Sequence, residues 1–134
     1  MADGSWLIYG ATGFTGRLVA REAVRRGLEP VLAGRNGDRV FALAGELELP
    51  ARVFTLETPE DVRRGIEGVR LVLHCAGPFA RTAAPMVDAC LALRAPYLDI
   101  TGEIAVLEAV LARDEEAKAA GGGLVPGVGF DVVP

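Results

Sequence analysis

Apolar residues along this chain alternate between two patterns, short continuous runs and longer stretches in which they recur every three or four positions. Short apolar runs that end at glycine or proline are typical of strands buried on both faces. Apolar residues at helical spacing, with charged residues opposite, indicate amphipathic helices. The runs predict strands at Trp6–Tyr9, Pro30–Gly34, Arg52–Leu56, Val69–Cys75, Tyr97–Ile100 and Leu124–Val125.

The segments between these runs predict helices with recognisable ends. Asp38 is the expected cap of the second helix, whose inner positions run from Val40 to Leu47. Thr58 and Pro59 together form a strong helix start. This third helix ends at Gly68. The other predicted helices are Gly16–Arg26, Ala84–Leu93 and the longest, Ile104–Ala120.

Strand and helix alternate along the whole chain, which determines the predicted fold class. Strands that are apolar on both faces require helices on both sides of a parallel sheet. Right-handed crossovers then favour an α/β fold with a doubly wound, Rossmann-like parallel sheet. The length of 134 residues suits one domain, residues 1–134. Residues 127–134 include no closing helix or polar tail, so we expect the chain to be part of a longer protein.

Charge and composition indicate which classes of binding partner the chain could have. The net charge of −4, without a basic block among aromatic residues, argues against a nucleic-acid partner. Two cysteines are too few for a disulfide scaffold, and residues 1–5 do not resemble a secretory signal. No run approaches the roughly 18 apolar residues that span a bilayer. We therefore expect a soluble cytoplasmic protein with a small-molecule substrate.

A glycine-rich loop follows the first predicted strand. In Gly10-Ala11-Thr12-Gly13-Phe14-Thr15-Gly16, glycines stand at relative positions 1, 4 and 7, just before a helix. A dinucleotide needs a tight turn, backbone N–H groups near its pyrophosphate and the positive end of a helix. This loop therefore predicts a dinucleotide site, with a simple turn as the alternative. Its predicted contacts are Gly10, Thr12, Gly13, Phe14, Thr15 and Gly16.

The end of the second strand predicts the choice of cofactor. NAD-binding sites usually place Asp or Glu there, to bind the ribose hydroxyls. This strand instead ends in Gly34-Arg35-Asn36. An arginine can hold a 2′-phosphate through charge-assisted hydrogen bonds. Arg35 therefore favours NADP over NAD, although an exposed arginine after a strand is also common.

Small residues follow the fourth strand, at the edge of the sheet where ligands lie. Cys75, Ala76 and Gly77 would let a cofactor ribose approach the backbone, or would simply form a turn. No basic partner for the Cys75 thiol is evident, so a small buried residue is favoured over a nucleophile. His74 is the only histidine, so neither a histidine metal cluster nor any other metal site is predicted.

The fifth strand also ends in residues that could do chemistry. Asp99 or Glu103 could act as a general acid or base, but capping of the next helix by Thr101 explains the same residues. The Tyr-x-x-x-Lys pair of short-chain dehydrogenases is absent, because Asp114 stands four residues before the only lysine, Lys118.

Five motifs in order carry a resemblance to a known family. They are Gly10–Gly16, Leu32–Arg35, Cys75–Phe79, Tyr97–Glu103 and Pro126–Asp131. Together they resemble the saccharopine dehydrogenase-like family, including the N-terminal domain of its bacterial members that are similar to trans-acting enoyl reductases. The resemblance implies that residues 1–134 are the N-terminal NAD(P)-binding Rossmann domain of a longer protein, followed there by a substrate and dimerisation domain that this chain lacks. It also implies hydride transfer between nicotinamide and an imine, amino acid or enoyl substrate, with Asp99 and Asp131 as catalytic residues near that substrate.

Three hypotheses follow. The first is an NADP-dependent oxidoreductase, of which this chain alone would be inactive. The second is a nonenzymatic redox sensor of the NmrA-like type, whose members also carry an Ala-Thr-Gly-Phe-Thr-Gly loop. The third is a structural Rossmann domain without a ligand. An exposed sheet edge or apolar patch, where the absent domain would pack, further predicts that the chain forms a homodimer.

Overall fold

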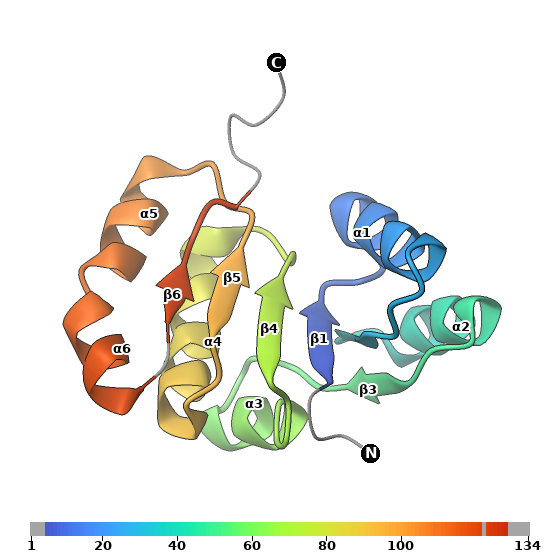
Figure 1. Ribbon diagram of the computed structural model, residues 1–134, viewed down its shortest axis with the longest axis horizontal. Coiled ribbons are helices and arrows are strands. Elements are labelled where there is room, and N and C mark those ends of the chain that lie inside the picture. Colours follow the sequence, from blue (N-terminus) through green and yellow to red (C-terminus); the bar gives the residue numbers. More distant parts are fainter. Residues whose placement is uncertain (1–4, 122, 129–134) are drawn as a thin grey trace.

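A six-stranded parallel sheet forms the centre of the protein, as a computed structural model of residues 5–121 and 123–128 shows (Figure 1). The strand order is β3-β2-β1-β4-β5-β6, so the chain reverses direction across the sheet between β3 and β4. This arrangement confirms the predicted doubly wound α/β fold. The strands are β1 (Trp6–Tyr9), β2 (Val31–Gly34), β3 (Ala51–Val53), β4 (Leu71–His74), β5 (Tyr97–Asp99) and β6 (Leu124–Val125).

The helices connect successive strands and differ from the predicted ones at several ends. They are α1 (Phe14–Arg25), α2 (Gly37–Leu47), α3 (Pro59–Gly65), α4 (Phe79–Leu93), α5 (Ile104–Leu111) and α6 (Asp114–Ala120). Thr58 caps α3 as predicted, because its side chain accepts a hydrogen bond from Asp61 N. The expected Asp38 cap of α2 is wrong. Asn36 takes that position, and its side chain accepts from the backbone N–H of Arg39.

Helix α4 begins five residues before the predicted Ala84 and is the longest described helix. It contains Pro85, which cannot donate the usual hydrogen bond to the preceding turn. Phe79 and Ala83 are both buried in the core. This tertiary packing extends the helix across the proline, an effect that local propensity does not predict.

The predicted helix Ile104–Ala120 is wrong, because the chain breaks it into α5 and α6. Arg113 lies at the break, with φ −98° and ψ 12°. Its guanidinium pairs with Asp88 of α4 at 2.5 Å and with Glu116 of α6 at 3.0 Å. The break allows Val106 of α5 and Ala117 of α6 to be buried in one core.

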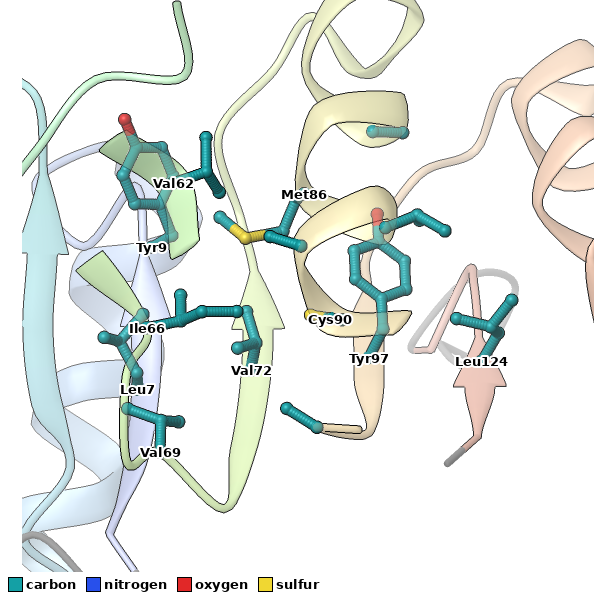
Figure 2. Packing of buried hydrophobic residues seen from close by; sticks show 14 of the residues in the cluster. Leu7, Tyr9, Val62, Ile66, Val69, Val72, Met86, Cys90, Tyr97 and Leu124 are labelled. Atoms are coloured by element: carbon teal, nitrogen blue, oxygen red, sulfur yellow. The ribbon is translucent and has the colours of Figure 1, made fainter. Parts of the chain in front are cut away.

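Two apolar cores flank the sheet. On one face, α3 and α4 pack against β1, β4 and β5, and Figure 2 shows Met86 and Cys90 of α4 beside Val72 and Tyr97 of the sheet. On the other face, α1 and α2 cover Ile8 of β1 and Leu32 of β2. Helices therefore pack on both faces of the sheet and hold the carboxyl ends of β1 and β2 in place.

The second face is covered unevenly. Among the described residues, α1 packs on β1 and α2 packs on β2 and β3. Leu73 and Leu98 of β4 and β5 are only partly buried on this side, and Val125 of β6 is 48% exposed. An apolar strip along β4, β5 and β6 is thus accessible from this face.

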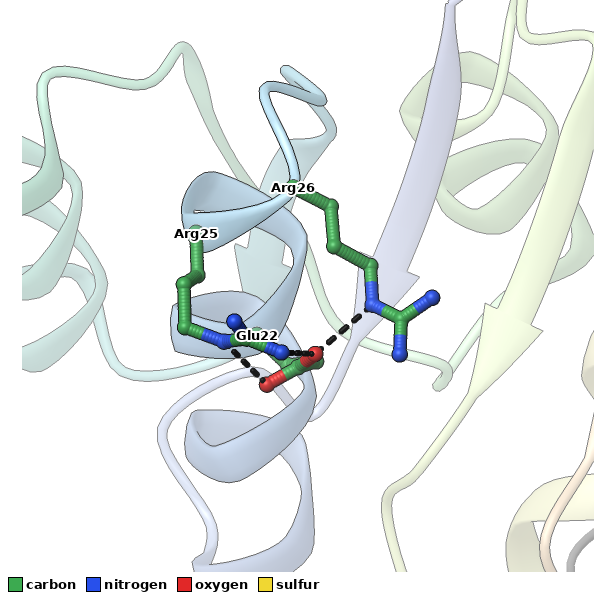
Figure 3. Close-up of polar contacts among 3 residues, drawn as sticks. All are labelled: Glu22, Arg25 and Arg26. Atoms are coloured by element: carbon green, nitrogen blue, oxygen red, sulfur yellow. Dashed lines mark hydrogen bonds and ion pairs between the residues drawn. The ribbon is translucent and has the colours of Figure 1, made fainter.

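The outer face of α1 carries a small ion-pair cluster (Figure 3). Glu22 accepts hydrogen bonds from both Arg25 and Arg26, at 2.5 Å and 2.6 Å. These bonds, first to Arg25 and then to Arg26, lower the pKa of Glu22 to about 2. Exposed pairs of this kind contribute little to stability, so the buried face of α1 positions this helix.

No helix in the described part of the chain combines the length and apolar character needed to cross a membrane.

Candidate cofactor site

A cleft of about 890 Å³ lies at the carboxyl ends of β1, β2 and β4. This is the edge where ligands bind in open α/β sheets, and the volume is within the range of small-molecule sites. Eight of the ten predicted cofactor residues line it, namely Gly10, Thr12, Gly13, Phe14, Arg35, Cys75, Ala76 and Gly77. The other two, Thr15 and Gly16, lie in the first turn of α1 beside the cleft.

Each glycine of the loop between β1 and α1 has its own physical role. Gly10 has φ +82°, and a Cβ atom there would lie 2.7 Å from the backbone nitrogen of Ala76. A Cβ atom on Gly16 would overlap the carbonyl oxygen of Gly10. The first glycine therefore lets β1 and the β4 turn approach closely, and the third brings α1 against the loop.

Gly13 has a different role, because its backbone is extended and would accept any side chain. A Cβ atom there would meet only Gly10 O, at 3.5 Å, and Gly13 is exposed in the cleft. As N-cap of α1 it supplies no side-chain hydrogen bond, and the first turn holds no acidic residue. The N–H groups of Phe14, Thr15 and Gly16 have no acceptor among the described residues. This helix end is open to an anion.

Arginine dominates the charge of the cleft, although the whole chain carries −4. Five arginines line the cleft with only one carboxylate, that of Glu57: Arg17, Arg21, Arg35, Arg39 and Arg81. Arg21 pairs with Glu46 at 2.7 Å. By contrast, Arg35, Arg39 and Arg81 form no ion pair with any described residue. The cleft is therefore suited to a ligand with several negative charges.

Sequence reasoning identified Arg35 and missed Arg39 and Arg81. Arg39 follows Arg35 by four positions, and the Asn36 cap places it in the first turn of α2. The Arg35-Asn36 pair followed by Arg39 is a local signal that could have been found. Arg81 carried no such signal, because only the fold brings the first turn of α4 to the cleft.

The residues present fit a dinucleotide with a 2′-phosphate. The glycine loop has no side chain at Gly13, which leaves room for a pyrophosphate beside the unbonded N–H groups of α1. The end of β2 carries Arg35, which can bind the 2′-phosphate, whereas an acidic residue there would repel it.

Tyr9 and Cys75 in the cleft wall are both neutral at neutral pH. Burial raises the pKa of the Tyr9 hydroxyl to about 12, against a smaller opposing effect of Arg35. That hydroxyl donates to Phe54 O at 2.9 Å. Burial likewise raises the pKa of the Cys75 thiol to about 12. Both residues therefore form the wall rather than exchange protons.

The predicted catalytic residues lie apart from the cleft or outside the described chain. Asp99 is fully buried, and its carboxylate accepts from Tyr97 Oη at 2.5 Å, Thr101 N at 3.1 Å and Gly127 N at 2.8 Å. These bonds tie the end of β5 to the segment after β6. Asp131 lies outside the described residues. A catalytic role for either remains a prediction.

The region after β5 differs from the predicted capping. Glu103, which is exposed, is the N-cap of α5. The hydroxyl of Thr101, two residues earlier, accepts a hydrogen bond from Glu103 N at 3.1 Å. Thr101 is therefore not the helix cap, because its buried side chain closes the turn before the helix.

Comparison with known proteins gives a consistent picture. The family model described as saccharopine dehydrogenase NADP binding domain matches residues 6–125. A probable mitochondrial saccharopine dehydrogenase-like oxidoreductase of Arabidopsis thaliana is 36% identical, and a trans-acting enoyl reductase of Mycobacterium leprae is 32% identical. Each match covers 96% of this chain and 32% of the relative. The chain thus spans about a third of the length of these relatives.

Solved structures share the fold. Apo saccharopine dehydrogenase (L-Glu forming) from Saccharomyces cerevisiae superposes with a TM-score of 0.79 at 16% identity, over 96% of this chain and 28% of that protein. Triphenylmethane reductase from Citrobacter sp., complexed with NADP(H), gives a TM-score of 0.70 at 19% identity, over 90% of this chain and 48% of that protein.

Proposed function

The chain belongs to the saccharopine dehydrogenase NADP-binding domain family and its cofactor is NADP, and from that premise we propose that it is the cofactor-binding domain of an NADP-dependent oxidoreductase. The observation that carries the proposal is the open N-terminus of α1 in a cleft where neither Arg35 nor Arg39 forms an ion pair with a described residue. The match to the family confirms the prediction of NADP from Arg35-Asn36.

Each part of the cleft has a proposed task. The Gly10–Gly16 loop and the free N–H groups of α1 bind the pyrophosphate. Arg35 binds the 2′-phosphate, with Arg39 as a second guanidinium beside it. Ala76 and Gly77 approach the ribose that carries the nicotinamide, with Cys75 behind them. When bound, the nicotinamide supplies or accepts the hydride.

The substrate proposal comes from the relatives. The saccharopine dehydrogenase-like and enoyl reductase descriptions support hydride transfer with an imine, amino acid or enoyl group in a small molecule. We propose that residues 1–134 supply the cofactor domain and that a further domain of the full protein binds this substrate. Asp99 and Asp131 remain proposed substrate neighbours. The apolar strip on β4, β5 and β6 supports association with that domain or with a second copy.

A second candidate is a redox sensor that binds NADP without turnover. Burial keeps Tyr9 and Cys75 of the cleft protonated at neutral pH, and the chain lacks a Tyr-x-x-x-Lys pair. The full-length protein distinguishes the two functions. An enzyme oxidises NADPH when an imine or enoyl substrate is added, whereas a sensor binds NADPH and leaves it unchanged.

Calorimetric titration of this chain with NADPH and NADH tests the cofactor site. We expect NADPH to bind more tightly. Arg35→Ala should weaken NADPH binding by about 10-fold or more, because it removes a charge-assisted contact, and should change NADH binding by less than about twofold. Arg63→Ala, which removes an exposed arginine of α3 outside the cleft, is the matched control. Failure of the parent chain to bind either nucleotide, or equal losses for both in Arg35→Ala, would count against the proposal.

A further inference from the structure

Thr82, in the first turn of α4, forms hydrogen bonds back across the turn that links β4 to α4. Its hydroxyl donates to the carbonyl oxygen of Ala76 at 2.6 Å and lies 2.9 Å from Nε2 of His74. A hydroxyl has one proton, and the short bond to Ala76 uses it. Thr82 therefore accepts from His74, which must carry its proton on Nε2.

His74 is held firmly in this arrangement. The ring is fully buried and contacts Tyr9, Phe79 and Tyr97, at centroid distances of 5.9 Å, 5.1 Å and 6.0 Å. Its Nδ1 atom has no hydrogen-bond partner among the described residues. Burial lowers the pKa of His74 to about 4, so the ring is neutral at neutral pH and has a single N–H to donate. The direction of the hydrogen-bond chain, from His74 to Thr82 to Ala76, is thereby fixed.

The bond to Ala76 sets the orientation of the next peptide group. The Ala76–Gly77 peptide is trans, so its C=O and N–H point in opposite directions in one plane. Since Thr82 holds the carbonyl of Ala76, the N–H of Gly77 points away from Thr82. Gly77 is exposed in the cleft, and its N–H has no acceptor among the described residues.

The position of this N–H relative to the arginines indicates which half of the cofactor it meets. Arg35 follows β2, and β4 lies two strands from β2 on the other side of β1. Two strand spacings amount to about 10 Å. With the 2′-phosphate at Arg35 and the pyrophosphate over the loop after β1, the turn after β4 faces the nicotinamide half.

We propose that His74 and Thr82 are positioning residues, which orient the Ala76–Gly77 peptide so that the N–H of Gly77 donates a hydrogen bond to the nicotinamide-bearing ribose of NADP. The inference rests on the proposed cofactor function. It adds to that function a partly buried hydrogen-bond chain that orients a donor toward the cofactor. Gly77 supplies the donor, Thr82 sets its direction, and His74 holds Thr82.

Two variants of Thr82 and two ligands test this role. Thr82→Val keeps the shape of the side chain and removes the hydroxyl, whereas Thr82→Ser keeps the hydroxyl. NADPH contains both halves of the cofactor, whereas adenosine 2′,5′-bisphosphate lacks the nicotinamide ribose. In calorimetric titrations we expect Thr82→Val to weaken NADPH binding by about three- to tenfold and to change binding of the bisphosphate by less than about twofold. Thr82→Ser should bind both ligands as the parent chain does.

The outcomes separate this inference from the proposed function. If the parent chain binds neither ligand, the proposed function fails, and the inference fails with it. If the parent chain binds NADPH and Thr82→Val binds it equally well, only the positioning role is overturned. Equal losses for both ligands, or a loss in Thr82→Ser as large as in Thr82→Val, would show a general structural effect and would also overturn it.

A measurement on the unaltered chain keeps the inference testable if Thr82→Val does not fold. In a ¹⁵N–¹H correlation spectrum, the amide signal of Gly77 should shift on addition of NADPH and should stay in place with adenosine 2′,5′-bisphosphate. The amide signal of the exposed, distant Gly45 should not respond to either ligand. A Gly77 signal that is unmoved by NADPH would overturn the inference.

Discussion

His74 is the only histidine in the chain, and burial determines its chemistry. Removal from water disfavours the charged ring more than the nearby Asp99 favours it, so the pKa falls from 6.5 to about 4. A protonated ring would also lose its fixed pattern of one donor and one bare nitrogen. The residue is thus a neutral donor within the fold.

This shift predicts how stability depends on pH. Between pH 6.5 and about pH 4 the unfolded chain binds a proton at His74 and the folded chain does not, so the free energy of unfolding falls as the pH falls. The contribution of His74 is complete above pH 6.5, and at most about 3 kcal/mol is lost through this window. Urea unfolding at a series of pH values measures it. His74→Gln should show a flatter profile between pH 5 and pH 6.5, where no other histidine titrates. Parallel profiles for the two proteins would contradict the prediction.

Residue patterns indicated the turn made by the glycines, but not the surroundings of Asp99. Gly10, Gly13 and Gly16 could be identified because turn geometry and helix start are local properties, fixed by spacing along the chain. The environment of Asp99 could not, because its partner Gly127 is 28 residues away in sequence. Whether a carboxylate is free or fully hydrogen-bonded depends on such distant partners.

At the scale of an element, the N-terminus of α1 is left without a cap. Gly13 has φ −75° and ψ 174°, which suit a capping side chain, yet it provides none. Helix α2, by contrast, is capped by Asn36 and α3 by Thr58. Helix α1, whose N-terminus faces the cleft, thus leaves its first N–H groups to a ligand.

A carboxylate at Gly13 should therefore separate stability from binding. Gly13→Asp should leave the free energy of unfolding unchanged or raise it by about 0.5 kcal/mol at most, since Asp is a good N-cap. It should weaken NADPH binding by about 10-fold or more, because its charge occupies the place of the pyrophosphate. Gly13→Asn caps equally well without charge and is the control. Thermal unfolding and calorimetry measure both effects, and NADPH binding equal to that of Gly13→Asn would contradict the proposed role of charge.

Helix ends also show what element-level patterns miss. The break at Arg113 and the extension of α4 across Pro85 both follow from packing against distant elements. Local periodicity predicted the buried residues Val40, Leu43 and Ala44 of α2, whereas the ends of the helices depended on the rest of the fold.

At the scale of the whole molecule, charge is distributed unevenly. The chain carries −4 overall, yet its cleft gathers five arginines and one carboxylate. The fold concentrates positive charge at one sheet edge within an acidic protein. Such a field attracts anionic ligands over longer distances at low ionic strength.

Salt should therefore weaken the binding of NADPH more than that of NADH. Raising the salt from about 0.01 M to about 0.15 M shortens the screening length from about 30 Å to about 8 Å. We expect NADPH affinity to fall several-fold and NADH affinity, without the 2′-phosphate, to fall less. Arg39→Ala should reduce the difference between the two nucleotides. Calorimetry at several salt concentrations measures this, and equal salt dependence for both would be inconsistent with arginine recognition of the 2′-phosphate.

The sequence by itself determined the alternation of strands and helices, the glycine loop and the arginine after β2. These features depend on periodicity, turn geometry and charge within a few residues. The tertiary structure alone decided which side chains share the cleft, how Thr82 and His74 orient Gly77, and that Asp99 is fully hydrogen-bonded. Burial and hydrogen-bond partners depend on parallel strands that bring the ends of β1, β2 and β4 to one edge of the sheet. Tyr9 meets Phe54, and Asp99 meets Gly127, because the sheet places residues side by side that are far apart in the sequence.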